Sequence, residues 1–221
     1  MITSGIPFSY ATKTEVVDVV SGESCADLAD FPLVNDGAVG ANLNGTPIVC
    51  GGFNSDQKEL QTCYKYTKSG WQKFASMKKH RWLAAGVMFK NKFQVFGGWG
   101  GTGTSGQKSE IISIDGVVEY GPELPKAVAR HAITFINSTV SIMSGGSFGT
   151  LTWFFNHETN VFSSGPSLLK SRERHGSATI VDKVTKAKIP IVAGGWNDGR
   201  LDSTELLIQG QWQSGTIQCP K

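Results

Sequence analysis

Short apolar runs followed by paired glycines recur along the chain. In the first clear copy, Ile48-Val49-Cys50 leads into Gly51-Gly52. The first glycines of successive pairs lie 46, 48 and 49 residues apart, a spacing that is too regular for coincidence and typical of internal repeats. Each run is short and shows no helical periodicity, so we expect it to be a strand. The other pairs are Gly97-Gly98, Gly145-Gly146 and Gly194-Gly195.

A second strand pattern precedes each run, and a third follows the polar loop after each glycine pair. Turn-like residues such as Asn44-Gly45 separate the first two patterns and indicate a hairpin. The first strands are expected at 36–43, 84–89, 132–136 and 176–181, and the third strands at 62–66, 110–114, 152–155 and 203–208. Together with the segments that follow, each repeat predicts about four short strands in roughly 47 residues.

An aromatic residue follows the third strand in three of the repeats, at Trp71, Phe162 and Trp212. Four strands in a unit of this length match one blade of a β-propeller. The succession of apolar run, paired glycine, polar loop, Tyr66 and Trp71 resembles the kelch repeat, whose period is near 50 residues. The second repeat departs from this pattern, because it has Ile112 and Ile114 in place of the aromatics.

The resemblance to the kelch-repeat family covers nearly the whole chain. It implies an all-β fold, a kelch-type β-propeller of about five four-stranded blades, in which Tyr66, Trp71 and Trp212 cover the faces between blades. The paired glycines would mark crowded strand ends. We expect one domain with blades at 1–33 (incomplete), 34–81, 82–130, 131–174 and 175–221.

The first of these blades lacks its innermost strand, and Ser4-Gly5 is its degraded glycine motif. Kelch propellers commonly carry six or seven blades. We therefore expect the chain to be part of a larger propeller, and the alternative is a five-bladed ring with one defective blade. An open ring leaves exposed edges, which favours aggregation or dimerisation.

Composition narrows the range of partners. Aromatic residues make up 10% and charged residues 18% of the 221 residues, which is enough to build a core. The net charge is +3 without a long basic run, so nucleic acid is not the expected partner. No stretch of 18 apolar residues predicts a membrane span, and Met1 to Tyr10 lacks the pattern of a signal peptide.

The four cysteines bear on the compartment. Cys50 ends the second strand of its repeat and Cys63 begins the third, so the two face each other on neighbouring antiparallel strands and predict a disulfide. Cys25 and Cys219 could pair only if the chain ends meet, and the alternative is four free thiols. Asn44 and Asn137 begin N-x-S/T sequons at the same hairpin position of their repeats. These features favour a secreted glycoprotein over a cytoplasmic protein.

Arginine and histidine recur together at the end of three repeats. These residues come just before the innermost strand of a blade. Their side chains could therefore line one mouth of a central channel and bind an anion or an acidic peptide. The alternative, which we favour, is that the arginines brace neighbouring blades. The predicted residues are Arg81, Arg130 and Arg174 with His131 and His175, and His80 adjoins Arg81.

The loops after the glycine pairs are the other candidate binding surface. These loops vary in length and composition, whereas the strands recur at a nearly constant spacing. Recognition commonly lies in variable loops on a rigid scaffold. Three of them begin with an aromatic residue, namely Phe53, Trp99 and Trp196. Exposed aromatics beside arginine are typical binding hot spots, whereas packing against a neighbouring blade is the alternative for the same residues.

No catalytic motif or metal-ligand spacing is present, so we expect neither an enzyme nor a cofactor or metal site. The sequence favours a secreted module that binds a protein of unknown identity. The resemblance also allows an intracellular kelch substrate adaptor or cytoskeletal binder. A third alternative, a galactose-oxidase-like copper enzyme, would need two histidines and a cysteine-modified tyrosine at the ring axis.

Overall fold

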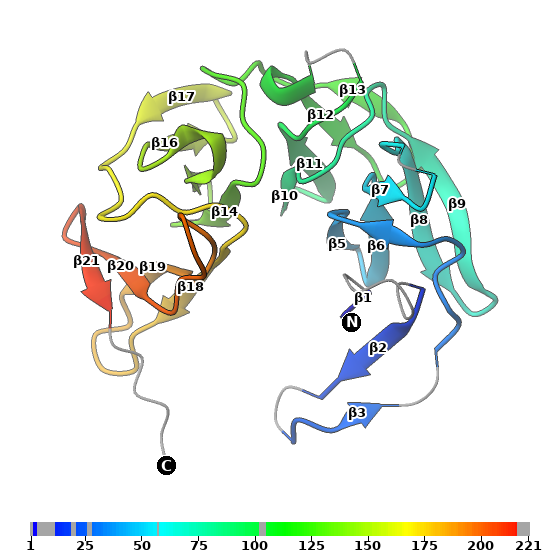
Figure 1. Ribbon diagram of the computed structural model, residues 1–221, viewed down its shortest axis with the longest axis horizontal. Helices are drawn as coiled ribbons and strands as arrows, with labels where there is room; N and C mark the ends of the chain where they lie inside the picture. The colour runs from blue at the N-terminus through cyan, green and yellow to red at the C-terminus, as the bar shows by residue number, and fades with distance from the viewer. Residues whose placement is uncertain are drawn as a thin grey trace. The chain divides into compact units, whose positions relative to one another are not determined.

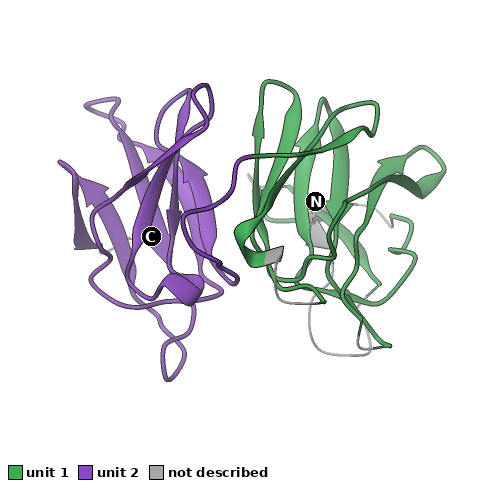
Figure 2. Cartoon of the chain, turned by 90° about the horizontal axis from the view of Figure 1, so that it is seen from above, with its two compact units in different colours: residues 1–121 green, residues 122–221 purple. Residues whose placement is uncertain are grey.

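The computed structural model describes residues 2–3, 12–18, 21–25, 28–56, 58–101 and 105–215. The chain divides into two compact units, residues 1–121 and 122–221, and each is described by itself (Figure 2). Within these described ranges, all regular elements are strands except two short 3-10 helices, η1 (Ser105–Gln107) and η2 (Gly146–Phe148). The all-β prediction is therefore confirmed, whereas the expectation of a single domain stays a prediction.

The first unit contains two four-stranded antiparallel sheets (Figure 1). The first sheet has the order β5 (Val39–Leu43), β6 (Thr46–Cys50), β8 (Thr62–Thr67) and β9 (Gly70–Ser76). The second has the order β10 (Ala85–Phe89), β11 (Lys92–Phe96), β12 (Ser109–Ile112) and β13 (Val118–Tyr120).

Two smaller sheets precede and flank them. β1 (Ile2–Thr3), β2 (Thr14–Val17) and β3 (Ser24–Cys25) form a three-stranded sheet, and the prediction of an incomplete first blade stays a prediction. β4 (Asn35–Asp36) pairs with β7 (Phe53–Asn54). The glycine motif predicted at Ser4-Gly5 lies outside the described residues.

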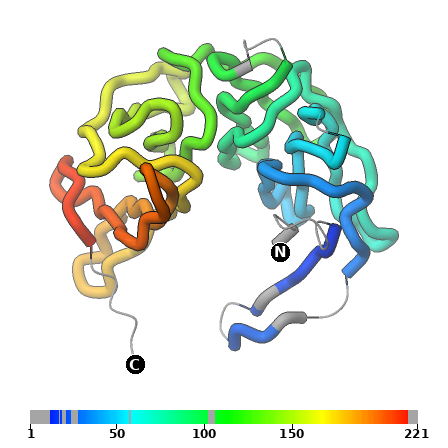
Figure 3. The backbone as a smooth tube through the Cα atoms, viewed as in Figure 1, coloured from blue at the N-terminus to red at the C-terminus, as the bar shows by residue number. Residues whose placement is uncertain are grey.

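The second unit repeats the same sheet twice. One sheet has the order β14 (Ala132–Phe135), β15 (Val140–Ser144), β16 (Thr152–Asn156) and β17 (Val161–Ser164). The other has the order β18 (Gly176–Val181), β19 (Lys188–Ala193), β20 (Thr204–Ile208) and β21 (Gln211–Gly215). In every four-stranded sheet the strands are arranged in the order in which they occur along the chain. The colours of Figure 3 trace the chain from the N-terminus to the C-terminus. The predicted first and third strands are all present, with ends shifted by at most three residues.

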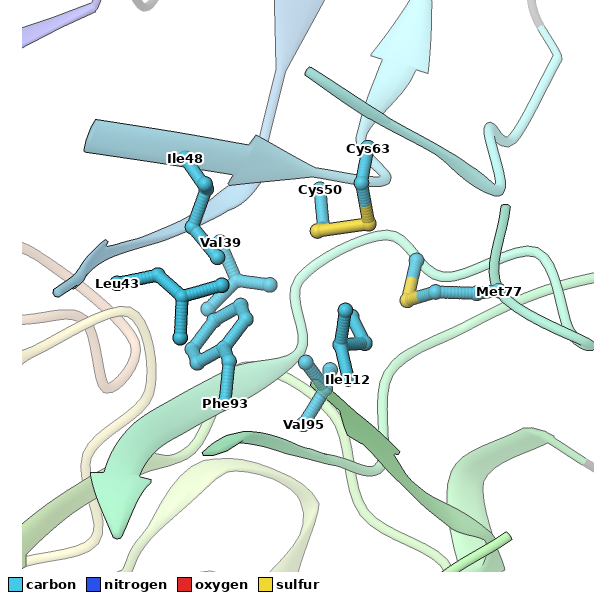
Figure 4. Packing of buried hydrophobic residues seen from close by; sticks show 9 residues of the cluster. All are labelled: Val39, Leu43, Ile48, Cys50, Cys63, Met77, Phe93, Val95 and Ile112. Atoms are coloured by element: carbon cyan, nitrogen blue, oxygen red, sulfur yellow. A yellow bond between two sulfur atoms is a disulfide. The ribbon is translucent and has the colours of Figure 1, made fainter. Parts of the chain in front are cut away.

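Apolar side chains from neighbouring sheets form the core of each unit. In the first unit, Ile48 and the Cys50–Cys63 disulfide of one sheet pack against Phe93 and Val95 of the next (Figure 4). In the second unit, Ile142 packs with Leu168, Val192 and Trp212. Each sheet thus hides an apolar face against its neighbour, which is why a single repeat would not be stable alone.

The predicted structural aromatics lie in the fourth strand or close to it. The Trp71 ring packs edge-on against Phe31 and Tyr66, with centroids 5.0 and 5.2 Å apart, and its Nε1 donates to Thr14 Oγ1 at 3.0 Å. Trp212 is 4% exposed within the core of the second unit. The glycines of all four pairs have positive φ, which explains their residue type. They are Gly51, Gly52, Gly97, Gly98, Gly145, Gly146, Gly194 and Gly195.

Candidate functional site

The residue after each glycine pair is held by the backbone of the segment that precedes the first strand of the same sheet. In the first unit, Trp82 and Trp99 exchange two backbone hydrogen bonds, both 2.7 Å long. In the second unit, Glu173 and Trp196 do the same at 3.0 and 2.9 Å. The backbone at both tryptophans is therefore fixed by paired hydrogen bonds although each lies in a loop.

The three aromatics predicted to bind a partner have different surroundings. Trp99 is 50% exposed and Trp196 is 48% exposed. Phe53 is half-buried instead, and its ring lies 4.9 Å from the Trp82 ring at an interplanar angle of 31°. Packing thus accounts for Phe53, whereas the two tryptophans combine a fixed backbone with a half-exposed indole. This combination is the geometry that a binding anchor requires.

The arginines of the repeats do not form one set. Arg81 is 1% exposed, and its guanidinium donates to Glu110 Oε1 from Nη2 at 2.9 Å and to the carbonyl of Gly97 from Nη1. Burial lowers the pKa of Arg81, and the charge of Glu110 opposes that effect. This arginine is enclosed within the first unit and offers no surface to a ligand.

Sequence reasoning placed Arg174 at the position equivalent to Arg81, and the structure corrects this to Arg172. Arg172 donates to Glu205 at 2.8 Å and to the carbonyl of Gly194 at 2.7 Å, as Arg81 does to Glu110 and Gly97. Arg174 lies two residues further on and is exposed. Arg172, Glu110 and Glu205 were missed, although each glutamate lies at a similar distance after its glycine pair.

Arg130 has a third environment. Its Nη1 lies 3.0 Å from Glu173 Oε2, and both side chains are slightly more than a quarter exposed, at 28% and 27%. Glu173 is the residue whose backbone holds Trp196. Arg130, Glu173 and Trp196 are therefore linked through an ion pair and backbone hydrogen bonds, and the exposed Arg174 donates its backbone N–H to the carbonyl of Arg130 at 2.8 Å.

The predicted histidines His131 and His175 are buried. Burial, assisted by the charge of His175, lowers the pKa of His131 to about 3. Burial, with the charge of Arg172 in second place, lowers the pKa of His175 to about 4. The Nε2 of His175 lies 3.0 Å from Ser144 Oγ. These rings are neutral parts of the interior, and His80 in the first unit is exposed.

Both sequon asparagines lie at hairpin turns, as the sequence predicted. Asn44 and Asn137 are exposed, between β5 and β6 and between β14 and β15 respectively. The Asn137 Oδ1 accepts hydrogen bonds from the backbone of Thr139 and Val140 at 2.9 and 2.7 Å, which orders the turn. Because the second strand runs from this turn to the glycine pair, each sequon lies at the end of its sheet opposite the glycine pair of that sheet.

The predicted disulfide between Cys50 and Cys63 is confirmed, and it joins paired residues of β6 and β8. Cys219 lies outside the described residues, so its pairing with Cys25 stays a prediction. Within the described ranges, no group of three or more His, Cys, Asp or Glu side chains is arranged to hold a metal ion. No helix in that part of the chain is long and apolar enough to cross a membrane.

Comparison with known proteins supports the fold. No family profile matches the chain, and no curated protein is similar in sequence. The structure is similar to that of YjhT, a kelch-repeat β-propeller protein, with a TM-score of 0.77 at 15% identity. The match covers 93% of this chain and 78% of YjhT. The chain therefore has a kelch-like β-propeller fold.

Proposed function

We propose that the chain is a non-enzymatic protein-interaction module that binds its partner through the loops after the glycine pairs. The observation that carries the proposal is the equivalence of Trp99 and Trp196. Both follow a glycine pair, both are held by two backbone hydrogen bonds, and both residues are about half exposed. A large aromatic with a fixed backbone loses little conformational freedom on binding, which makes it an effective anchor.

The polar surroundings of Trp196 suggest the chemistry of the partner. Arg130 is paired with both carboxylate oxygens of Glu173, at 3.2 and 3.0 Å, and the neighbouring Arg174 is exposed. A guanidinium group recognises carboxylates through paired hydrogen bonds. The partner is accordingly a protein segment that combines a cavity for an indole with acidic side chains.

An oxidising compartment is the proposed location. The Cys50–Cys63 disulfide agrees with it, since such bonds persist mainly in secreted and surface proteins. The exposed turns at Asn44 and Asn137 are accessible to a glycosyltransferase, and glycans there would project from the ends of their sheets opposite the glycine-pair loops. Glycosylation and partner binding would therefore not compete.

The binding proposal is tested by comparing two variants of the immobilised protein. Trp99→Ala combined with Trp196→Ala should release the partners that the wild type retains from the native extracellular fluid. Val117→Ala is the control, because Val117 is 53% exposed but lies in the turn at the opposite end of its sheet. Retention of the same proteins by the tryptophan variant would contradict the proposal.

Two measurements separate the alternatives. Mass spectrometry of non-reduced peptides should find the Cys50–Cys63 bridge and glycans on Asn44 and Asn137. Reduced cysteines with unmodified asparagines would favour the intracellular adaptor or cytoskeletal binder. Metal analysis of the purified protein tests the oxidase alternative, and stoichiometric copper would overturn the proposal of a non-enzymatic module.

A further inference from the structure

A hollow of about 450 Å³ lies on one face of the sheet β14–β17, beside the turn that joins β14 to β15. Its apolar part consists of Ile136, Val140 and Phe154, which are half-buried, and of Val161, which is 57% exposed. Strand pairing sets Val140, Asn156 and Val161 side by side in one row of this face. The register of the sheet therefore fixes the lining of the hollow.

Uncharged polar groups complete this lining. They belong to Asn137, Asn156, Thr159 and Ser163, and none of the lining residues carries a charge. The Asn156 Oδ1 accepts the backbone N–H groups of Glu158 and Thr159 at 2.9 and 3.1 Å, so its Nδ2 remains as a donor. An apolar surface with a few polar groups is typical of a small-ligand site. A sugar ring presents the matching surfaces, C–H groups on its faces and hydroxyl groups around its edge.

Asn137 places the attachment point of a sugar at this hollow. It lines the hollow and begins the sequon Asn137-Ser138-Thr139. Its Oδ1 is held by the turn, since it accepts the backbone N–H groups of Thr139 and Val140. The side-chain amide is thereby oriented through its oxygen, and the turn does not use Nδ2, which is the atom that carries an N-linked glycan.

The other sequon has a different environment. Asn44 lies at the equivalent turn of its own sheet and is exposed. That sheet also has a hollow, of about 480 Å³, which is lined by residues such as Asn42, Pro47 and Trp71, and Asn44 is not one of them. The two sequons therefore share a position in the repeat but differ in their surroundings, which makes Asn44 a matched comparison for Asn137.

We propose that the first sugar of an N-linked glycan on Asn137, an N-acetylglucosamine, fills this hollow and becomes part of the folded structure. The C–H face of the sugar packs on Val140 and Phe154, its polar groups meet Asn156 and Ser163, and the rest of the glycan extends from this end of the sheet. Attachment forms a bond between Nδ2 and the anomeric carbon of the sugar and breaks the bond from that carbon to the diphosphate of a lipid-linked donor. The Nδ2 proton leaves with the released diphosphate. The proposal rests on the glycosylating compartment of the proposed function.

The test compares the two sequons by their effect on stability. Thr46→Ala removes the Asn44 sequon and Thr139→Ala removes the Asn137 sequon, and both leave the asparagines in place. Each full-length variant is made in the secretory pathway of animal cells, with its glycan trimmed to one N-acetylglucosamine. It is also made without glycans in the bacterial periplasm, where the disulfide can form as well. Urea denaturation of the two forms of each variant isolates the effect of the sugar.

The sugar is expected to stabilise the fold from Asn137 but not from Asn44. Covering roughly 50 Å² of apolar surface changes the unfolding equilibrium constant about tenfold. The sugar on Asn137, present in Thr46→Ala, should therefore lower this constant about tenfold, and the sugar on Asn44, present in Thr139→Ala, by less than about twofold. Adding Val161→Ser to Thr46→Ala should reduce the effect of the sugar to less than about threefold, because it removes apolar lining of the hollow.

Leu169→Ser is the matched control for Val161→Ser. Leu169 is 54% exposed in the link between β17 and β18, outside the hollow, so its substitution should leave the effect of the sugar unchanged. Mass spectrometry establishes whether Asn137 carries the glycan, and its absence would contradict the proposed glycoprotein and this proposal together. A glycan on Asn137 that stabilises no more than the one on Asn44, or that is insensitive to Val161→Ser, would overturn the packing of the sugar alone. An equal effect of Leu169→Ser would overturn it as well.

Discussion

Arg81 and Glu110 form a fully buried ion pair, and Arg172 and Glu205 repeat it in the second unit. The nitrogen–oxygen distances are 2.9 and 2.8 Å. In both cases the glutamate also accepts backbone N–H groups three and two residues before the arginine, from Lys78 and Lys79 or from Leu169 and Lys170. Each carboxylate therefore anchors the link that leads into its sheet.

The two repeats without this ion pair lack the arginine, the glutamate and the backbone N–H three residues before the arginine position. Asn35 occupies the arginine position before β5, and Tyr64 lies where the glutamate would be. Asn35 Nδ2 still donates to the carbonyl of Gly51 at 3.0 Å. Three residues before Asn35 stands Pro32, which has no N–H that would require a carboxylate. The repeat that contains β14 follows the same rule, with Val128, Trp153 and Pro125.

Arg172→Ala is expected to destabilise the protein by about 3–5 kcal/mol, because it leaves Glu205 buried without its partner. Arg174→Ala is the control, since that side chain is exposed, and it should change stability by less than about 0.5 kcal/mol. Urea denaturation of the three proteins measures both effects. Equal losses would show that the buried pair does not stabilise the fold.

The same residues show what the sequence could and could not reveal. Paired glycines are visible in any reading because their backbone conformation demands glycine, so the repeat period, the strands and the fold class were predictable. The position of the paired arginine was not predictable, because the segments that link one repeat to the next differ in length. Arg81 follows Gly51 by 30 residues, whereas Arg172 follows Gly145 by 27. The nearby Arg174-His175 pair therefore resembled His80-Arg81 more closely than Arg172 did.

The aromatic loop residues show a second limit. Phe53, Trp99 and Trp196 have the same sequence context, and all three follow a glycine pair. The Phe53 ring packs against the ring of Trp82. Trp82 stands at a position where other repeats have Asp36 and Glu173. Exposure of a loop aromatic thus depends on a contact between distant residues, which the local pattern does not contain.

Loss of the disulfide is expected to lower the free energy of unfolding. The Cys50–Cys63 bridge closes a short loop with a sequence separation of 13, and a loop of this size is stabilised by roughly 2–4 kcal/mol. The double variant Cys50→Ala with Cys63→Ala should lose about that amount. A reductant should lower the denaturation midpoint of the wild type to a similar degree and leave that of the double variant unchanged. A wild type indifferent to the reductant would contradict this prediction.

Acid should destabilise the second unit through its buried histidines. His131, His157 and His175 have pKa values lowered to about 3, 4 and 4, each mainly by burial. Below pH 6.5 the unfolded chain binds protons that the folded chain excludes, so stability falls as the pH falls from 6.5 towards about 4. Each histidine contributes up to about 1.4 kcal/mol per pH unit in that window.

His131→Phe isolates this effect, because neither ring nitrogen of His131 has a hydrogen-bond partner among the described residues. The variant should reduce the slope of stability against pH between 4 and 6.5 while leaving the stability above pH 7 close to that of the wild type. His80→Phe is the matched control, since His80 is exposed. The same slope in all three proteins would mean that His131 is not a source of the acid sensitivity.

Gly51→Ala should be more costly than Gly45→Ala, although both glycines have positive φ, +66° and +83°. At Gly45 a Cβ would meet no atom within 4 Å, so only the left-handed backbone penalty of about 1–2 kcal/mol applies. At Gly51 the Cβ would collide with the carbonyl oxygen of Arg81 and approach Met77 Cε to 3.0 Å. Because that carbonyl accepts the N–H of Gly52 at 2.7 Å, the backbone cannot yield without breaking the hydrogen bond. We expect Gly51→Ala to lose roughly a further 1–3 kcal/mol of unfolding free energy. Thermal and urea denaturation measure both variants. Equal losses at the two sites would show that the glycine pair is not required for a close approach between segments.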